Sequence, residues 1–176
     1  MNKQIIFWIS GVLIIFAACK NTPKEETMSN NPLLQDFDTP FQVPPFEEIE
    51  TGHYLPAFKK AIEAHSAEVQ EIVAQEAAPD FSNTIAALDY SGQLLDRVSS
   101  VFFNMTSAHT SDTLQEIARE VSPMLSKHRD NIRLNEELFA RVKAVYEQRN
   151  ELDFTTEQAN LLDKTYKDFV RGGANL

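Results

Sequence analysis

The histidines, serines and acidic residues are the side chains that could do chemistry in this sequence, yet their spacing forms no known catalytic motif. A helical two-histidine zinc site needs histidines four residues apart. The histidines are His53, His65, His109 and His128. No H-E-x-x-H, G-x-S-x-G or phosphate-binding G-x-G-x-x-G motif occurs in the 176 residues. The sequence therefore predicts no catalytic residue and no metal ligand in this chain.

Each histidine has a structural interpretation. His65 lies on an apolar stripe with Glu68 three residues later, which favours a packed histidine over a substrate contact. His53 stands at the expected start of a helix and His109 in an expected turn, so both are predicted to be structural or exposed. His128 is expected near the end of a helix, where a cation interacts favourably with the helix dipole.

The remaining polar and aromatic side chains also fit structural roles. The serines lie in no nucleophile-elbow context, and carboxylates such as Glu47, Glu48, Glu136 and Glu137 fall in expected first turns and exposed faces. A set of aromatic residues favours a packed core, although it could instead line a groove for apolar peptide side chains. The set is Phe81, Phe102, Phe103, Phe139, Tyr146, Phe154, Tyr166 and Phe169.

Composition places the chain among globular proteins of one domain. With 176 residues, of which 43% are hydrophobic and 24% charged, the chain can bury a modest core. Its formal net charge of −10 repels phosphate backbones, so the sequence argues against nucleic-acid binding. The single cysteine, Cys19, excludes an internal disulfide.

The first residues have the pattern of a secretion signal. The mainly apolar run from Ile5 to Ala18 has the length of a signal-peptide core, and it is shorter than the about 20 residues of a membrane-spanning helix. It ends in Phe16-Ala17-Ala18-Cys19, which resembles the lipobox of bacterial lipoproteins. The sequence thus predicts a lipoprotein signal over 1–18 and a lipidated Cys19. An ordinary signal peptide with an incidental cysteine and a membrane-spanning anchor are the alternatives.

The segment after the signal is expected to connect the lipid to a folded domain. Residues 19–36 are polar, contain prolines and lack an apolar period, as in a flexible tether. Residues 37–50 carry Pro40, Pro44 and Pro45, which favour an extended backbone. Four apolar residues are predicted to anchor this stretch along the domain, the alternative being a disordered linker. They are Phe37, Phe41, Val43 and Phe46.

The rest of the chain has the periodicity of amphipathic helices. Over 54–75, one face repeats at spacings of three and four residues. This face consists of Phe58, Ile62, His65, Val69 and Ile72. A second helix is expected to begin at Ser82 or Asn83 and to continue to about 105, with Gly92 in its interior.

Capping signals predict where three further helices begin. These signals are Asp112 with Gln115 or Thr113 with Glu116, then Asn135, and then Thr155 with Gln158. Gly172 and Gly173 are expected to end the last helix. The predicted fold is all-α, an array of about five antiparallel amphipathic helices over 37–176, in which each apolar stripe needs a partner.

An ordered series of short blocks gives this region a family resemblance. The blocks are Asn31-Pro32-Leu33-Leu34, Pro40-Phe41, Pro44-Pro45-Phe46, His53-Tyr54-Leu55-Pro56-Ala57-Phe58, Phe81-Ser82-Asn83-Thr84-Ile85-Ala86-Ala87-Leu88, Val101-Phe102-Phe103-Asn104, Ser122-Pro123-Met124-Leu125-Ser126, Leu138-Phe139-Ala140-Arg141-Val142-Lys143-Ala144-Val145-Tyr146 and Lys164-Thr165-Tyr166-Lys167-Asp168-Phe169-Val170-Arg171. The series resembles the N-terminal helical region of the thimet-oligopeptidase-like zinc metallopeptidases. Within that family it resembles the bacterial peptidyl-dipeptidases (dipeptidyl carboxypeptidases) and oligopeptidase A.

The resemblance implies one wall of a peptide channel within a larger helical peptidase fold. In that family the other half of the fold holds zinc through the two histidines of H-E-x-x-H and a later glutamate, and the motif glutamate acts as general base. Such enzymes remove dipeptides from the C-terminus of short peptides. None of those zinc ligands can be placed on this sequence. The resemblance therefore implies a zinc enzyme whose catalytic part is absent from this sequence, and the chain alone is expected to bind no zinc and to be inactive.

Two interpretations remain open. The chain is either the front part of a lipid-anchored zinc peptidyl-dipeptidase or a complete lipid-anchored helical binding module without catalysis. The first predicts exposed apolar surface where a missing half would pack, with Phe102, Phe103 and Tyr166 as candidates, and the second predicts a stable domain that melts cooperatively. The expected location is the cell envelope, with attachment to the membrane through Cys19, and an outer membrane of a Gram-negative bacterium is favoured.

Overall fold

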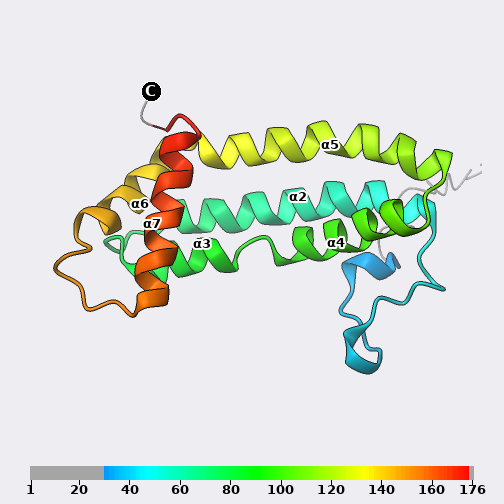
Figure 1. Ribbon diagram of the computed structural model, residues 1–176, viewed down its shortest axis with the longest axis horizontal. Helices are drawn as coiled ribbons and strands as arrows, with labels where there is room; N and C mark the ends of the chain where they lie inside the picture. The colour runs from blue at the N-terminus through cyan, green and yellow to red at the C-terminus, as the bar shows by residue number, and fades with distance from the viewer. Residues whose placement is uncertain (1–29, 175–176) are drawn as a thin grey trace, which may run out of the picture.

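A computed structural model describes residues 30–174, and no strand occurs in this part, which confirms the predicted all-α class (Figure 1). The helices are η1 (Pro32–Leu34), η2 (Pro40–Gln42), α2 (Thr51–Val73), the π-helix η3 (Phe81–Ala86), α3 (Ala87–Tyr90), α4 (Gln93–Ala108), α5 (Asp112–Arg133), α6 (Glu136–Glu147) and α7 (Thr156–Arg171). None of the helices in residues 30–174 is both long enough and apolar enough to cross a bilayer. The predicted signal peptide, Cys19 and most of the predicted tether lie outside the described residues.

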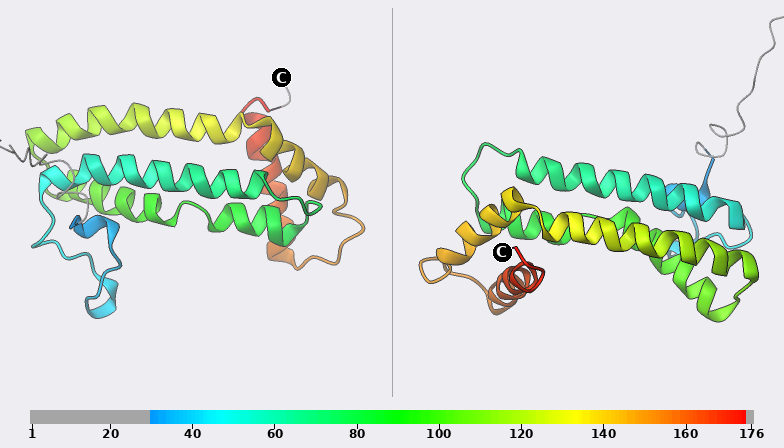
Figure 2. Two further views of the ribbon diagram at one scale, coloured as in Figure 1. Left: turned by 180° about the vertical axis from the view of Figure 1, so that it is seen from behind. Right: turned by 90° about the horizontal axis from the view of Figure 1, so that it is seen from above.

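Three long helical segments lie side by side, and two shorter helices cross one end of them (Figures 1 and 2). α2 lies in the middle and packs against α4 on one side and α5 on the other. Successive long segments run in opposite directions, as the predicted antiparallel array requires, so α2 and α5 run the same way. Because α2 is central, its side chains can join both neighbours.

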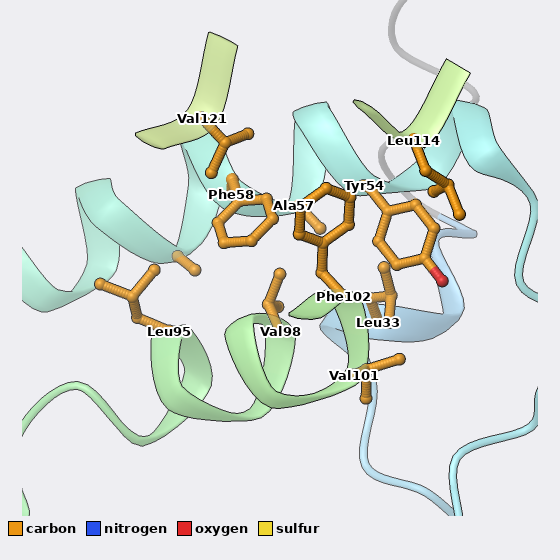
Figure 3. Packing of buried hydrophobic residues seen from close by; sticks show 11 residues of the cluster. Leu33, Tyr54, Ala57, Phe58, Leu95, Val98, Val101, Phe102, Leu114 and Val121 are labelled. Carbon is orange, nitrogen blue, oxygen red and sulfur yellow. The ribbon is translucent and has the colours of Figure 1, made fainter. Parts of the chain in front are cut away.

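The first core lies where α2, α4 and α5 meet. Figure 3 shows Phe102 of α4 between two aromatic residues of α2, with ring centroids 5.0 Å from Tyr54 and 5.3 Å from Phe58. Phe58 and Phe102 are fully buried, and burying each such side chain contributes about 1.5–3 kcal/mol. Leu33 of η1 is buried in the same cluster, so η1 is part of the folded domain.

The second core fills the space between the end of α2, η3, α6 and α7. Phe139 of α6 stacks on Tyr166 and Phe169 of α7, each at 5.9 Å between centroids. Tyr146 and Tyr166 stack more closely, at 3.8 Å. Most of the predicted aromatic set therefore packs in the two cores, and Phe102 cannot form an exposed seam because it has no exposed surface. Phe103 is the member that remains 38% exposed.

Side-chain caps begin the last two helices where the sequence predicts them. Asn135 Oδ1 accepts a hydrogen bond from the Leu138 N–H at 2.9 Å, which starts α6. Thr155 and Gln158 form a reciprocal capping box at the start of α7. Each cap satisfies backbone donors that a helix leaves without a partner in its first turn.

The caps of the second and third predicted helices lie earlier than expected. The predicted residues are Ser82 or Asn83 for the second helix and Asp112 or Thr113 for the third. Instead, the Asp80 carboxylate accepts from the Asn83 N–H at 2.7 Å, and Ser111 Oγ accepts from the Leu114 N–H. Several neighbouring residues at these places are of types that can cap a helix, so residue type alone does not single out one of them.

The C-terminus of α7 has the predicted glycine stop. Gly173 has φ of 98°, and its N–H donates to Val170 O, while the Ala174 N–H donates to Phe169 O. These two bonds are the pattern of a Schellman motif, which satisfies carbonyl groups at the end of a helix.

The predicted second helix is interrupted at Gly92. Helix α3 ends at Tyr90, Ser91 is extended, and Gly92 has φ of 80° and ψ of 12° before α4 begins. A Cβ at Gly92 would lie 2.7 Å from His65 Cε1, closer than such contacts allow. The prediction that Gly92 lies inside one continuous helix is therefore wrong, because the His65 ring occupies the space beside a left-handed backbone that favours glycine.

The segment between η1 and α2 projects from the body of the molecule (Figure 1). Of the four predicted anchors, Phe37 packs on the first core. Phe41 is 99% exposed, and Val43 and Phe46 are each 48% exposed, so the prediction is wrong for these three. Phe41 and Gln42 have φ of 60° and 55°, a left-handed turn that directs the Phe41 side chain into solvent.

Arg141 joins α6 to the loop after α2, a contact that the sequence does not predict. Its guanidinium is buried and donates to Gln75 O at 3.0 Å, to Ala77 O at 3.4 Å and to Asn83 Oδ1 at 3.1 Å. No carboxylate of residues 30–174 pairs with it within 4 Å. Backbone and amide oxygens thus hold this charge and fix the loop between α2 and η3.

Candidate functional site

A groove runs between α4 and α5, and the central helix α2 forms its floor. Two hollows lie along it, of about 340 Å³ and about 330 Å³. The first is lined on its apolar side by Leu95, Phe103 and Leu125. The second extends past the break at Gly92 toward α7. The two hollows meet at the residues that line both of them, which are His65, Asp96, Arg129 and Ile132.

A pair of histidines lies where the hollows meet. His65 on α2 is partly buried and His128 on α5 is buried, and His65 Nδ1 lies 3.0 Å from His128 Nε2. The other nitrogen of His65, Nε2, lies 3.1 Å from Ser91 Oγ at the break between α3 and α4. His128 Nδ1 lies 3.4 Å from Ser66 Oγ, one residue beyond His65. A single line of polar atoms therefore connects Ser91, which lies just before α4, to α2 and to α5.

Burial keeps both rings neutral down to a lower pH than in free histidine. It lowers the pKa of His65, and the nearby carboxylates of Glu68 and Asp96 oppose this effect without reversing it. It also lowers the pKa of His128, and positive charge on His65 lowers that pKa further. The pair can thus bind or release protons close to the floor of the groove.

The rim of the second hollow carries charged side chains of both signs. The acidic residues are Asp89, Asp96 and Asp168, and the basic residues are Arg129, Arg133 and Lys164. Within residues 30–174 none of these six takes part in an ion pair. A groove of this kind has donors and acceptors available for a polar ligand such as a peptide.

Curated relatives of this sequence include bacterial peptidases. The dipeptidyl carboxypeptidase of Salmonella typhimurium is 46% identical over 149 residues, which are 85% of this chain and 22% of the relative. The dipeptidyl carboxypeptidase of Escherichia coli is 43% identical over 146 residues, 83% of this chain and 21% of the relative. The chain belongs to the thimet-oligopeptidase-like peptidase family. Oligopeptidase A of Escherichia coli is 29% identical over the same share of the chain.

The match covers only part of these peptidases. The chain spans about a fifth of the length of the curated relatives that it matches. No protein-family model matches the chain. The family assignment therefore describes this stretch of sequence, and the chemistry of a whole peptidase does not follow from it alone.

The described residues, 30–174, do not fit the zinc site that the family resemblance implies. Within residues 30–174 there is no group of three or more His, Cys, Asp or Glu side chains placed to hold a metal ion. The His65–His128 pair supplies two nitrogens that face each other as hydrogen-bond partners. No step of a zinc mechanism can be assigned to these side chains.

The structure brings together two of the histidines that the sequence treats separately. His65 is packed, as predicted. The prediction that His128 acts as a cation on the dipole at a helix end is wrong, because the His128 ring is buried against α2 and faces His65. His53 Nδ1 accepts from the Glu50 N–H at the start of α2, and His109 follows the end of α4 in an exposed position, as predicted. One signal could have revealed the pair. His128 continues the spacing of Leu114, Val121 and Leu125, the apolar stripe of α5.

Proposed function

We propose that this chain is the N-terminal, channel-wall part of a peptidase that removes C-terminal dipeptides from short peptides. The observation that carries this proposal is the 46% identity to a dipeptidyl carboxypeptidase over 85% of the chain. The lower identity to oligopeptidase A, 29%, favours the dipeptide-releasing branch of the family. The groove between α4 and α5, with both signs of charge on its rim, supports a surface that faces peptides.

On this proposal the described part of the chain positions peptides and does not cleave them. Zinc would supply the activated water of such a peptidase, and its ligands would come from sequence beyond these 176 residues. The 176-residue chain alone is therefore expected to show no peptidase activity with or without added zinc.

The proposal includes attachment to the cell envelope through Cys19. The apolar run before Cys19 and the polar stretch after it support a lipid-anchored protein, in the outer membrane of a Gram-negative bacterium. Replacing the acceptor, Cys19→Ser, should move the protein from the detergent phase to the aqueous phase in a detergent partition assay. Retention of the Cys19→Ser protein in the detergent phase would rule out anchoring by lipidation.

The size of the native product tests the main proposal. An antibody raised against residues 50–170 should detect in the source cell a product several times larger than 19.9 kDa. That product should release dipeptides from short peptides, and a chelator should abolish the activity. A band near 19.9 kDa as the sole product would overturn the proposal.

A second candidate function is a lipid-anchored helical binding module without catalysis. The observation in its favour is that two apolar cores close within residues 30–174. This alternative expects a single cooperative melt of the 176-residue chain and little binding of an apolar dye. The peptidase proposal expects dye binding, because surface that contacts the rest of the enzyme is exposed.

A further inference from the structure

The positions of the hydrogen atoms follow from the partners of the two serines. Ser91 Oγ donates its hydrogen to Leu88 O at 2.7 Å, so this oxygen can only accept from His65. His65 therefore carries its hydrogen on Nε2, and its Nδ1 is an acceptor. The facing atom, His128 Nε2, must then be the donor of the 3.0 Å bond between the rings.

At the other end of the line, the contact between His128 and Ser66 lacks a hydrogen atom. Ser66 Oγ donates to Ile62 O at 2.8 Å, and it lies 3.4 Å from His128 Nδ1. In a neutral His128 this nitrogen carries no hydrogen, so two acceptors face each other. One added proton on His128 Nδ1 would donate to Ser66 Oγ, and every other bond of the line would remain.

A second proton has no compatible place. It would have to bind His65 Nδ1, where the new N–H would face the His128 Nε2–H across 3.0 Å. The two donors and two positive charges would repel, and the bond between the two imidazole rings would be lost.

We propose that His65 and His128 form a proton-sharing pair that joins α5 to α2, holds one proton without structural change, and opens the α2–α5 contact when a second proton binds. The opened contact lies at the floor of the groove, so the same event would change the two hollows. This device goes beyond the proposed peptidase function and does not depend on it.

The charges around the pair favour one added proton. Glu68 of α2 and Asp96 of α4 lie close enough to act on His65, and Asp89 of α3 and Asp168 of α7 line the second hollow beside it. The basic residues of the same hollow are Arg129 and Arg133 of α5 and Lys164 of α7. Four carboxylates and three cations leave one negative charge, which a single proton on the pair would balance. A second proton would make the site positive.

Stability should fall as the solution becomes acidic. Burial holds the pKa of both rings below the ordinary value of 6.5. Between that value and the lowered ones, the unfolded chain binds more protons than the folded chain, so protonation favours unfolding. The stabilising contribution is present above about pH 6.5 and is lost as the pH falls through the pKa values of the folded pair.

Nitrogen NMR of the imidazole rings tests the pair directly. The full 176-residue chain, labelled with ¹⁵N-histidine in detergent micelles, should show His65 and His128 both as the Nε2–H tautomer at about pH 7.5. On acidification their signals should move in two coupled steps, with the first proton on His128. Two independent single-step titrations, or an Nδ1–H tautomer of His65 at the starting pH, would overturn the proposal.

A pair of variants separates the device from general acid sensitivity. His128→Gln keeps an N–H donor for His65 but cannot gain a proton, and His109→Gln removes an exposed histidine as a matched control. Between about pH 7.5 and about pH 5, the folding equilibrium constant of the His109→Gln chain should fall several-fold more than that of the His128→Gln chain, because His128→Gln has lost one of the two groups that bind protons on unfolding. Equal falls in the two variants would contradict the proposal. If the His128→Gln chain does not fold, the histidine tautomers and the titration steps of the native chain still test the proposal.

Discussion

At the scale of single residues, His65 and Gly92 depend on each other. The imidazole of His65 can reach His128 only because the chain beside it has no side chain and turns away from helical geometry. The Gly92 N–H in turn donates to Glu68 Oε2 at 2.6 Å, one turn along α2 from His65. Contacts to α2 therefore fix the break between α3 and α4, and the break leaves space for the His65 ring at the floor of the groove.

Substitution of Gly92 tests this dependence. Gly92→Ala should destabilise the chain by about 2 kcal/mol or more, because alanine costs about 1–2 kcal/mol in a left-handed conformation and its Cβ also displaces the His65 ring. Urea unfolding measures the change. Gly52→Ala is the matched control, since a Cβ at Gly52 meets nothing within 4 Å and this helical site should gain up to about 1 kcal/mol from alanine. Equal effects of the two substitutions would contradict the assigned strain at Gly92.

At the scale of helices, caps set where α6 and α7 begin and so how these helices cross the end of the long ones. The linker between α5 and α6 consists of only two residues, Leu134 and Asn135. The cap from Asn135 to Leu138 thus fixes the turn that directs the α6 apolar stripe into the second core. A weakened cap should loosen α6 before it affects α2 or α4.

The cap of α6 can be tested by truncation. Asn135→Ala should cost about 1 kcal/mol, the ordinary value for loss of a side-chain N-cap, because the Leu138 N–H loses its acceptor. Amide hydrogen exchange should rise first in the opening turn of α6. Asn150→Ala, at an exposed turn after α6, is the control and should change stability by less than about 0.5 kcal/mol. Unchanged exchange in α6 would show that packing alone holds its first turn.

Local patterns were sufficient to predict most helices but not the contacts between distant ones. The stripe through Phe58, Val69 and Ile72 predicted α2, because a helical period depends only on neighbours along the chain. The His65–His128 pair spans 63 positions, and its partners come together only when α2 and α5 pack side by side. The same limit explains Gly92, whose role depends on a ring from another helix.

At the scale of the whole molecule, most apolar side chains of residues 30–174 are buried in two cores, while three large ones are exposed on one projecting segment. Phe41, Val43 and Phe46 lie on that segment, and its acidic neighbours include Glu47 and Glu48. The left-handed turn at Phe41 costs free energy, and the Phe41 ring gains no burial within residues 30–174. Under the proposed function, the rest of a longer peptidase would cover this segment and supply the missing contacts.

The same substitution in a short and a long product should therefore have different effects. Phe41→Ser should change the unfolding free energy of the 176-residue chain by less than about 0.5 kcal/mol, because the side chain is 99% exposed. In a longer product whose remaining part packs on this segment, loss of a buried phenylalanine should cost about 3 kcal/mol or more. Tyr90→Ser, at a 76% exposed position away from the segment, is the control and should be near neutral in the short chain. A neutral Phe41→Ser in the long product would mean that its remaining part does not cover the segment, and a large cost in the short chain would contradict the exposed position of Phe41.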